Sequence, residues 1–281
     1  MAKMIGALCT SHVPAIGVAI DKGQTEEHYW KPLFDGYGPA RDWIEAQQPD
    51  VVILVYNDHA TVFDLDVIPT FAIGTADEYR PADEGWGPRQ VPVIEGHGEL
   101  GWHIAESLIL DEFDITVVNR MDVDHGLTVP LSITCGQPEH WPFKVVPLAV
   151  NVVQYPVPTG NRCFNLGRAL RRAVDAFEED IRVAIFGTGG MSHQLHGERA
   201  GLTNPKWDQR FLDDLSRDVD RLRKIPHIEY VRETGAEGIE MVMWLVARGA
   251  LGDDVREIYR HYHVPASNTA TGLIILEENQ D

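Results

Sequence analysis

The chain has 281 residues, with 24 Lys and Arg against 43 Asp and Glu, so its formal net charge is −19 at neutral pH. This acidity argues against a nucleic-acid partner or an anionic membrane surface, because both are bound through clustered Lys and Arg. An apolar fraction of 44% excludes general disorder, and the length suffices for a large hydrophobic core without disulfides.

Neither the N-terminus nor the cysteines point to secretion. The first residues lack a basic segment followed by an apolar one, and no apolar run reaches the roughly 20 residues that a membrane span needs. Cys9, Cys135 and Cys163 are far apart and form no C-x-x-C pattern. We therefore expect a cytoplasmic chain with reduced thiols and no membrane partner.

Short apolar runs predict strands, and amphipathic stretches between them predict helices. In chain order these are strand 4–9, helix 39–46, strands 51–56 and 67–73, helix 100–110, strands 115–118 and 145–150, helix 163–177, strand 183–186, helices 207–224, 236–248 and 253–262, and strand 273–276. Most of the strands are continuous apolar runs, typical of strands covered on both faces. The order predicts one α/β domain over residues 1–281, with a central, mostly parallel or mixed sheet flanked by helices.

Four histidines follow predicted strands closely. They are His12, His59, His125 and His193. Ligand sites of open α/β sheets lie at the carboxyl ends of the strands, so we expect these side chains to meet there. Imidazole suits a metal such as Zn or Fe, and it also suits proton transfer near neutral pH.

A catalytic metal site needs open coordination positions, and two histidines with one carboxylate leave several of them open, as in non-haem Fe(II) oxygenases. Glu240 begins an apolar helical run, where a carboxylate without a partner would be costly to bury. Glu237 lies one turn earlier and competes with it, and the spacing does not decide between them. A zinc site of several histidines remains an alternative.

Three further carboxylates lie near the histidines in the sequence. Asp58 precedes His59 and is a candidate ligand or orienting partner. Asp122 and Asp124 precede His125, and we expect them to orient its ring, as carboxylates often do for metal-site histidines.

Several long stretches carry a family resemblance. They are Ser-His-Val-Pro-Ala at 11–15, Val-Ile-Leu-Val-Tyr-Asn-Asp-His at 52–59, Pro-Ala-Asp-Glu-Gly-Trp-Gly-Pro-Arg at 81–89, Met-Asp-Val-Asp-His-Gly at 121–126, Gly-Thr-Gly-Gly-Met-Ser-His-Gln-Leu at 187–195 and Pro-Ala-Ser-Asn-Thr-Ala at 265–270. Through them the chain resembles, over nearly its whole length, the β subunits of protocatechuate 4,5-dioxygenases, which are class III extradiol ring-cleaving dioxygenases.

The resemblance implies roles for individual residues. His12, His59 and Glu240 would hold Fe(II), which selects Glu240 over Glu237. His193 would be the catalytic acid and base, and His125 would lie close to the substrate. The substrate-contacting pair of the family falls on Ser267 and Asn268.

The resemblance also implies an activity and a partner. The expected reaction is ring cleavage of protocatechuate by O₂ to 4-carboxy-2-hydroxymuconate-6-semialdehyde, with gallate and 3-O-methylgallate as alternative substrates. The chain leaves no room for a fused helical domain after its last predicted strand, so we expect a separate small helical α subunit in an α₂β₂ assembly. From other classes, a zinc-dependent hydrolase and a binding protein without catalysis remain alternatives.

Overall fold

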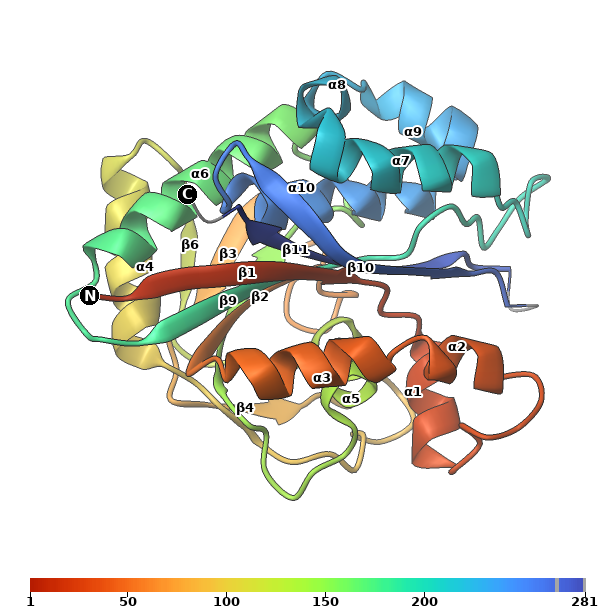
Figure 1. Cartoon of the computed structure of the whole chain (residues 1–281), viewed down its shortest axis with the longest axis horizontal. Coiled ribbons are helices and arrows are strands. Elements are labelled where there is room, and N and C mark those ends of the chain that lie inside the picture. Colours follow the sequence, from red (N-terminus) through yellow and green to blue (C-terminus); the bar gives the residue numbers. More distant parts are fainter. Residues whose placement is uncertain (266–267, 280–281) are drawn as a thin grey trace.

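The computed structural model describes residues 1–265 and 268–279. Its centre is an eight-stranded sheet flanked by helices on both faces (Figure 1). In sheet order the strands are β10 (Val255–His263), β11 (Thr271–Glu278), β1 (Lys3–Thr10), β9 (Arg182–Thr188), β2 (Val51–Tyr56), β8 (Lys144–Val150), β3 (Phe71–Gly74) and β6 (Thr116–Val118). The four strands β1, β9, β2 and β8 are parallel, whereas β11 and β3 run antiparallel to their central neighbours. The predicted layered α/β fold with a mixed sheet is confirmed.

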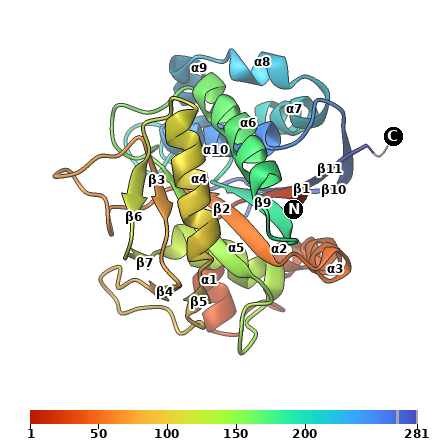
Figure 2. The same ribbon diagram turned by 90° about the vertical axis from the view of Figure 1, so that its left-hand side faces the viewer.

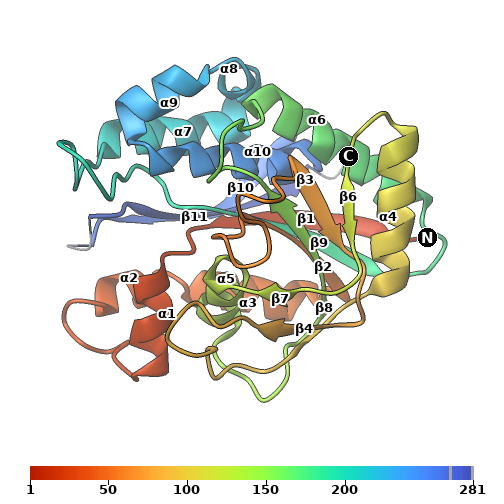
Figure 3. The same cartoon turned by 180° about the vertical axis from the view of Figure 1, so that it is seen from behind.

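Helices cover the two faces of the sheet separately (Figures 1 and 2). On one side lie α4 (Gly98–Leu110), α6 (Gly160–Ala176), α7 (Pro205–Arg217), α8 (Val219–Arg223), α9 (His227–Thr234) and α10 (Val242–Gly249). On the other lie α1 (Pro14–Asp21), α2 (Lys31–Asp35), α3 (Gly38–Gln47) and α5 (His125–Cys135). A small sheet of β5 (Ile94–Glu95), β4 (Glu78–Pro81) and β7 (Asp122–Val123) adjoins this second layer (Figures 2 and 3).

The alternation of side chains along the central strands builds two hydrophobic cores. In β2 every residue is buried: Val51, Ile53 and Val55 face one core, and the residues between them face the other. This is why the strand has no polar face and reads as a continuous apolar run.

The helix α10 is held close to α6 by glycines. A Cβ atom on Gly167 would lie 2.1 Å from the carbonyl oxygen of Val246, and one on Gly249 would lie 2.2 Å from that of Phe164. Larger residues would force the helices apart. This contact fixes α10, and with it the 3₁₀ turn Glu237–Met241 that leads into the helix.

Three predicted helices differ from the structure. The predicted helix 253–262 is wrong, because those residues form the edge strand β10, which pairs with β11. The predicted helix 207–224 breaks at Asp218, which leaves helical geometry and caps α8 by accepting the backbone N–H of Arg221. The predicted helix 236–248 begins as the 3₁₀ turn.

The described strands and helices also include elements that were not predicted. These are the helices α1, α2, α5 and α9 and the short strands β4, β5 and β7. Strand β3 starts at Phe71, later than predicted. No helix in the described part of the chain is long and apolar enough to cross a membrane.

Candidate active site

Three neighbouring parallel strands end at the same edge of the sheet and carry three of the four histidines. His12 follows β1, His59 follows β2, and His193 ends the loop that follows β9. His125 arrives by another route: β6 runs parallel to β3 and therefore opposite to the central strands. The chain returns through β7 to place His125 at the start of α5, so its expected delivery by the end of a parallel strand is wrong, although it reaches the same place.

The structure brings two histidines and one carboxylate together. His12, His59 and Glu240 each offer a ligand atom within 4.8 Å of the other two. The Nε2 atom of His12 lies 3.4 Å from Oε2 of Glu240. Nδ1 of His12 is hydrogen-bonded to Thr188 Oγ1 at 3.0 Å, and Nδ1 of His59 to Asp124 Oδ2 at 2.9 Å. Nε2 of His12 is thereby left to face Glu240, while Nε2 of His59 lies 3.0 Å from Nδ2 of Asn57.

Glycine lets the carboxylate approach. Gly189 has φ of 137°, and a Cβ atom there would lie 2.9 Å from Cβ of Glu240. The next residue, Gly190, donates its backbone N–H to Oε2 of Glu240 at 2.5 Å. Gly189 and Gly190, directly after β9, therefore position Glu240.

The charges of the cluster are set by burial and by its own members. Burial would raise the pKa of Glu240, but His12 and the other nearby histidines outweigh it and lower that pKa to about 2. Burial lowers the pKa of His12, which favours its neutral imidazole. Burial also acts to lower the pKa of His59, but the hydrogen bond and charge of Asp124 raise it overall.

The residues fit a bound metal ion. Nε2 of His12 is buried and has no hydrogen-bond partner among the described residues. A buried imidazole nitrogen without a partner is costly unless it binds something. Two imidazole nitrogens and one ionised carboxylate form the donor set of mononuclear non-haem iron sites.

Two further histidines line the same cavity without belonging to the cluster. Nδ1 of His193 donates to the carbonyl oxygen of Met191 at 2.8 Å, which leaves Nε2 free. His125 lies with its ring centroid 3.9 Å from that of His59, and its Nδ1 lies 2.5 Å from Oε2 of Glu84.

The cavity has a volume of about 660 Å³, within the usual range for small-molecule sites. Its described walls comprise His12, Val13, Pro14, Ala15, His59, His125, Val152, Val153, Gly190, His193, Leu195, Ala236, Glu237, Glu240 and Thr269. These walls contain no Lys or Arg. Any positive charge that this part of the chain offers to an anionic ligand therefore comes from imidazoles, backbone N–H groups and a bound metal.

The C-terminal pair behaves differently from the histidines. Ser267 lies outside the described residues. Asn268 is exposed, with φ of 61°, and is not one of the described wall residues. The neighbouring Thr269 lines the cavity and pairs with His193 through a backbone bridge.

The orienting carboxylates differ from those expected. Asp124 orients His59 rather than His125. Asp122 is exposed on β7, and Glu84 takes the place beside His125. Both carboxylate oxygens of Asp58 accept backbone N–H groups from residues 61–63, so Asp58 stabilises a turn.

Sequence reasoning missed Glu84, Thr188 and the carbonyl of Met191. The available signal for Glu84 was its place in the long loop rich in Pro and Gly between residues 74 and 98, since loops of this length are often functional. Thr188 lies in the stretch 187–195 that carries the family resemblance, but its hydrogen bond to His12 depends on the pairing of β9 with β1.

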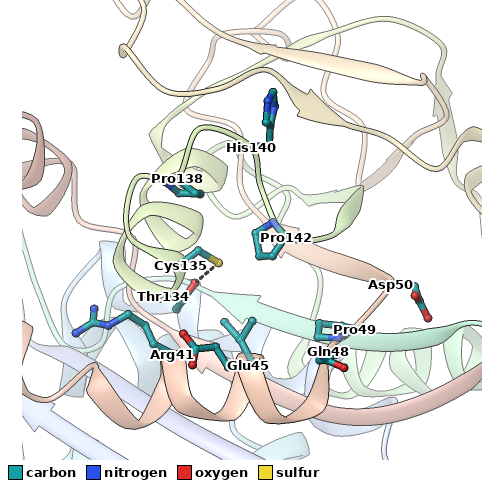
Figure 4. Close-up of a pocket in the computed structure, with 11 residues that line it drawn as sticks. Arg41, Glu45, Gln48, Pro49, Asp50, Thr134, Cys135, Pro138, His140 and Pro142 are labelled. Atoms are coloured by element: carbon teal, nitrogen blue, oxygen red, sulfur yellow. Dashed lines mark hydrogen bonds between the residues drawn. The ribbon is translucent and has the colours of Figure 1, made fainter.

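A second hollow, of about 480 Å³, lies beside α3 and the end of α5 (Figure 4). It is next to the amino end of β2, at the opposite edge of the sheet from His59. Its titratable side chains, among them Arg41, Asp50 and His140, come from separate segments and do not converge on one point in Figure 4. Burial raises the pKa of Cys135 there to about 12, which makes that thiol unreactive.

An α/β sheet with a two-histidine, one-carboxylate cluster at its carboxyl edge has the arrangement of a metal-dependent enzyme. The family described as the catalytic LigB subunit of aromatic ring-opening dioxygenase matches residues 6–272. The chain belongs to this family, and it is an extradiol ring-cleaving dioxygenase. This membership favours ring-opening chemistry over the zinc hydrolase and binding-protein alternatives.

The relatives refine the comparison. Gallate dioxygenase from Pseudomonas putida is 44% identical over 200 residues, which cover 71% of this chain and 58% of that protein. The match thus spans less than two thirds of that relative's length. A 2,3-dihydroxyphenylpropionate/2,3-dihydroxicinnamic acid 1,2-dioxygenase from Photorhabdus laumondii is 26% identical, with 96% of this chain and 95% of the relative covered.

Among solved structures, the uncharacterized protein JW3007 from Escherichia coli K12 has a TM-score of 0.55 at 13% identity. The alignment covers 98% of this chain and 100% of that one. At this identity the likeness shows a shared fold and nothing about activity.

Proposed function

We propose that this chain is the catalytic subunit of an Fe(II)-dependent dioxygenase that opens the ring of a catecholic acid beside its two hydroxyl groups. The observation that carries the proposal is the cluster of His12, His59 and Glu240 within 4.8 Å of one another. Fe(II) bound there would hold a catechol and O₂ at its open positions and let electrons pass from the ring to oxygen.

A residue of this chain would carry out the proton transfers to and from the substrate. His193 is fixed through Nδ1 by the carbonyl of Met191, so its Nε2 is the atom that can take a proton from a substrate hydroxyl and return it later. A general acid–base group placed in this way contributes about 10²–10⁴-fold to the rate. We assign this role to His193.

The walls of the cavity would hold the flat substrate and keep water out. Val152, Val153 and Leu195 give it apolar sides around the polar cluster. An aromatic ring packs favourably on such sides, while its hydroxyl groups face the histidines. His125 is placed to bind one of these hydroxyl groups.

For the substrate we propose gallate ahead of protocatechuate. The support is the 44% identity over 200 residues to the gallate dioxygenase. Protocatechuate and 3-O-methylgallate share the adjacent hydroxyl pair and serve as the comparison substrates.

We also propose that a separate small helical α subunit covers the cavity, in an α₂β₂ assembly. The support is apolar surface at the cavity, where the wall residues Val153 and Leu195 are 50% and 53% exposed. Exposed apolar residues gathered at one place are typical of a surface that meets a partner.

Anaerobic loading with Fe(II), followed by measurement of O₂ uptake, tests the function. We expect uptake with gallate to exceed that with protocatechuate and 3-O-methylgallate, and to require Fe(II) rather than Zn²⁺. A candidate α subunit should increase it. Absence of uptake with all three acids, with and without that subunit, would contradict the proposed function.

A further inference from the structure

We propose that Glu84 is a positioning residue that fixes the tautomer of His125, so that Nε2 of His125 faces the cavity as a hydrogen-bond acceptor. The proposal deepens the proposed function, because it assigns a second proton-handling group to the same site. It rests on contacts that Glu84 makes from a loop far away in the sequence.

Both oxygens of the Glu84 carboxylate contact His125. Oε1 accepts the backbone N–H of His125 at 2.9 Å, and Oε2 lies 2.5 Å from its Nδ1. The two side chains are only 13% and 10% exposed. A carboxylate oxygen in this position accepts from Nδ1–H, and in the neutral imidazole with that tautomer Nε2 carries the lone pair.

The loop that carries Glu84 is fixed by a local turn around Glu84 and by an ion pair with α1. Asp83 accepts the backbone N–H groups of Gly85 and Gly87, whose φ values of 102° and 88° require glycine. Arg89 makes two hydrogen bonds to Asp21 of α1, at 2.9 and 2.7 Å. The carboxylate is thus delivered by an anchored loop, and its aim at His125 is part of the fold.

A neighbouring pair repeats the arrangement. His59 has Asp124 on its Nδ1, and the rings of His59 and His125 are inclined by 30° with centroids 3.9 Å apart. His59 belongs to the cluster with His12 and Glu240, whereas His125 lines the cavity beside it. In both pairs a carboxylate fixes Nδ1 of an imidazole. For His59 this orients a proposed metal ligand, and for His125 it leaves Nε2 available to the substrate.

Replacement of Glu84 by Gln tests the proposed tautomer of His125, because an amide has an acceptor oxygen on one side and a donor NH₂ group on the other. The backbone N–H of His125 still needs an acceptor, which keeps the amide oxygen on that side. The amide NH₂ group then faces Nδ1 of His125 and donates to it. The proton moves to Nε2, and the group that faces the substrate changes from acceptor to donor.

The direct measurement is the ¹⁵N NMR signature of His125 in the metal-free chain labelled at histidine, with the signal assigned through His125→Gln. We expect the Nδ1–H tautomer in the wild type and the Nε2–H tautomer in Glu84→Gln. In the Fe(II)-loaded enzyme Glu84→Gln should lower kcat about 10- to 100-fold, with iron content unchanged and KM changed much less.

Asp21→Asn is the matched control, since it weakens the anchor of the same loop without touching His125. We expect it to keep the wild-type tautomer and a kcat within about twofold of the wild type, because this partly exposed ion pair makes no contact with His125. Equal losses of kcat in both variants would show that the loop's rigidity matters and the Glu84 contact does not, and would overturn the proposal.

The wild-type spectrum alone can also overturn the proposal. A protonated Nε2 with a bare Nδ1 on His125 would do so even if Glu84→Gln failed to fold. Because this readout needs neither iron nor turnover, the outcome is independent of whether the chain cleaves gallate.

Discussion

Each of the four site histidines has its Nδ1 atom occupied by a different group of the chain. The pairs are His12 with Thr188, His59 with Asp124, His125 with Glu84, and His193 with the Met191 carbonyl. Rings held in this way keep one orientation, and all four line one cavity. The site is therefore organised before any ligand arrives, which lowers the entropic cost of binding.

Substitution by alanine tests the role of His193. His193→Ala should keep its iron, because His193 is outside the cluster of three ligand atoms, and should lose turnover by about 10²–10⁴-fold. Iron content and O₂ uptake are measured on the same preparation. His196→Ala, an exposed histidine three residues along the chain, is the control and should turn over normally. Wild-type turnover by His193→Ala would remove the assigned role.

The histidines could be predicted from the sequence, but their partners could not. Placement after apolar strands indicated His12, His59 and His193, because strand ends meet at one edge whatever the details of packing. Glu84 contacts a residue 41 positions away through an irregular loop, and no periodic pattern encodes such a contact. The family resemblance, and not the spacing, selected Glu240 over Glu237 as the candidate ligand. In the structure, Glu237 accepts the backbone N–H of Leu195.

At the scale of elements, parallel strands were predicted better than helices. Buried strands are continuous apolar runs, and β2 was predicted with its observed bounds. The edge strand β10 was mistaken for a helix because it is mostly half-buried and carries charged residues, so its pairing with β11 decides its conformation. Helix α5 was missed because every residue from His125 to Thr134 is buried, which leaves no amphipathic pattern, and because it contains Pro130.

The first turn of α7 anchors the loop that carries His193. Asp208 is fully buried and accepts the backbone N–H of Ser192 at 3.1 Å, its hydroxyl at 2.5 Å, and the hydroxyl of Tyr262 at 2.8 Å. Burial raises the pKa of Asp208 from 3.8 to about 6. Because the folded pKa is the higher one, ionisation of Asp208 costs stability as the pH rises from about 4 to about 6.

Asp208→Asn should remove this cost. Relative to the wild type, the variant's free energy of unfolding should rise by about 2 kcal/mol between pH 4 and pH 7, since one pKa unit corresponds to about 1.4 kcal/mol. Urea unfolding at both pH values measures the difference, with Asp42→Asn on the exposed side of α3 as the control. A difference between Asp208→Asn and wild type that does not change with pH would contradict the assignment.

At the scale of the whole molecule, the chain has a net charge of −19, although its site is proposed to bind an anionic acid. The described walls of the cavity carry no Lys or Arg, so the acidic surface is not offset by basic side chains of this part of the chain. A divalent cation with its histidines would supply the positive potential at the point where the substrate binds. The metal would therefore contribute to binding of the substrate as well as to its oxidation.

Fe(II) binding by the whole chain tests most directly whether His12, His59 and Glu240 form a metal site. Anaerobic titration followed by dialysis should leave one Fe(II) per wild-type chain and per Glu237→Gln chain. Glu240→Gln should lose most of its iron, because it lacks the only carboxylate in the cluster of His12, His59 and Glu240. Full retention of iron by Glu240→Gln, or its loss from Glu237→Gln alone, would contradict the account.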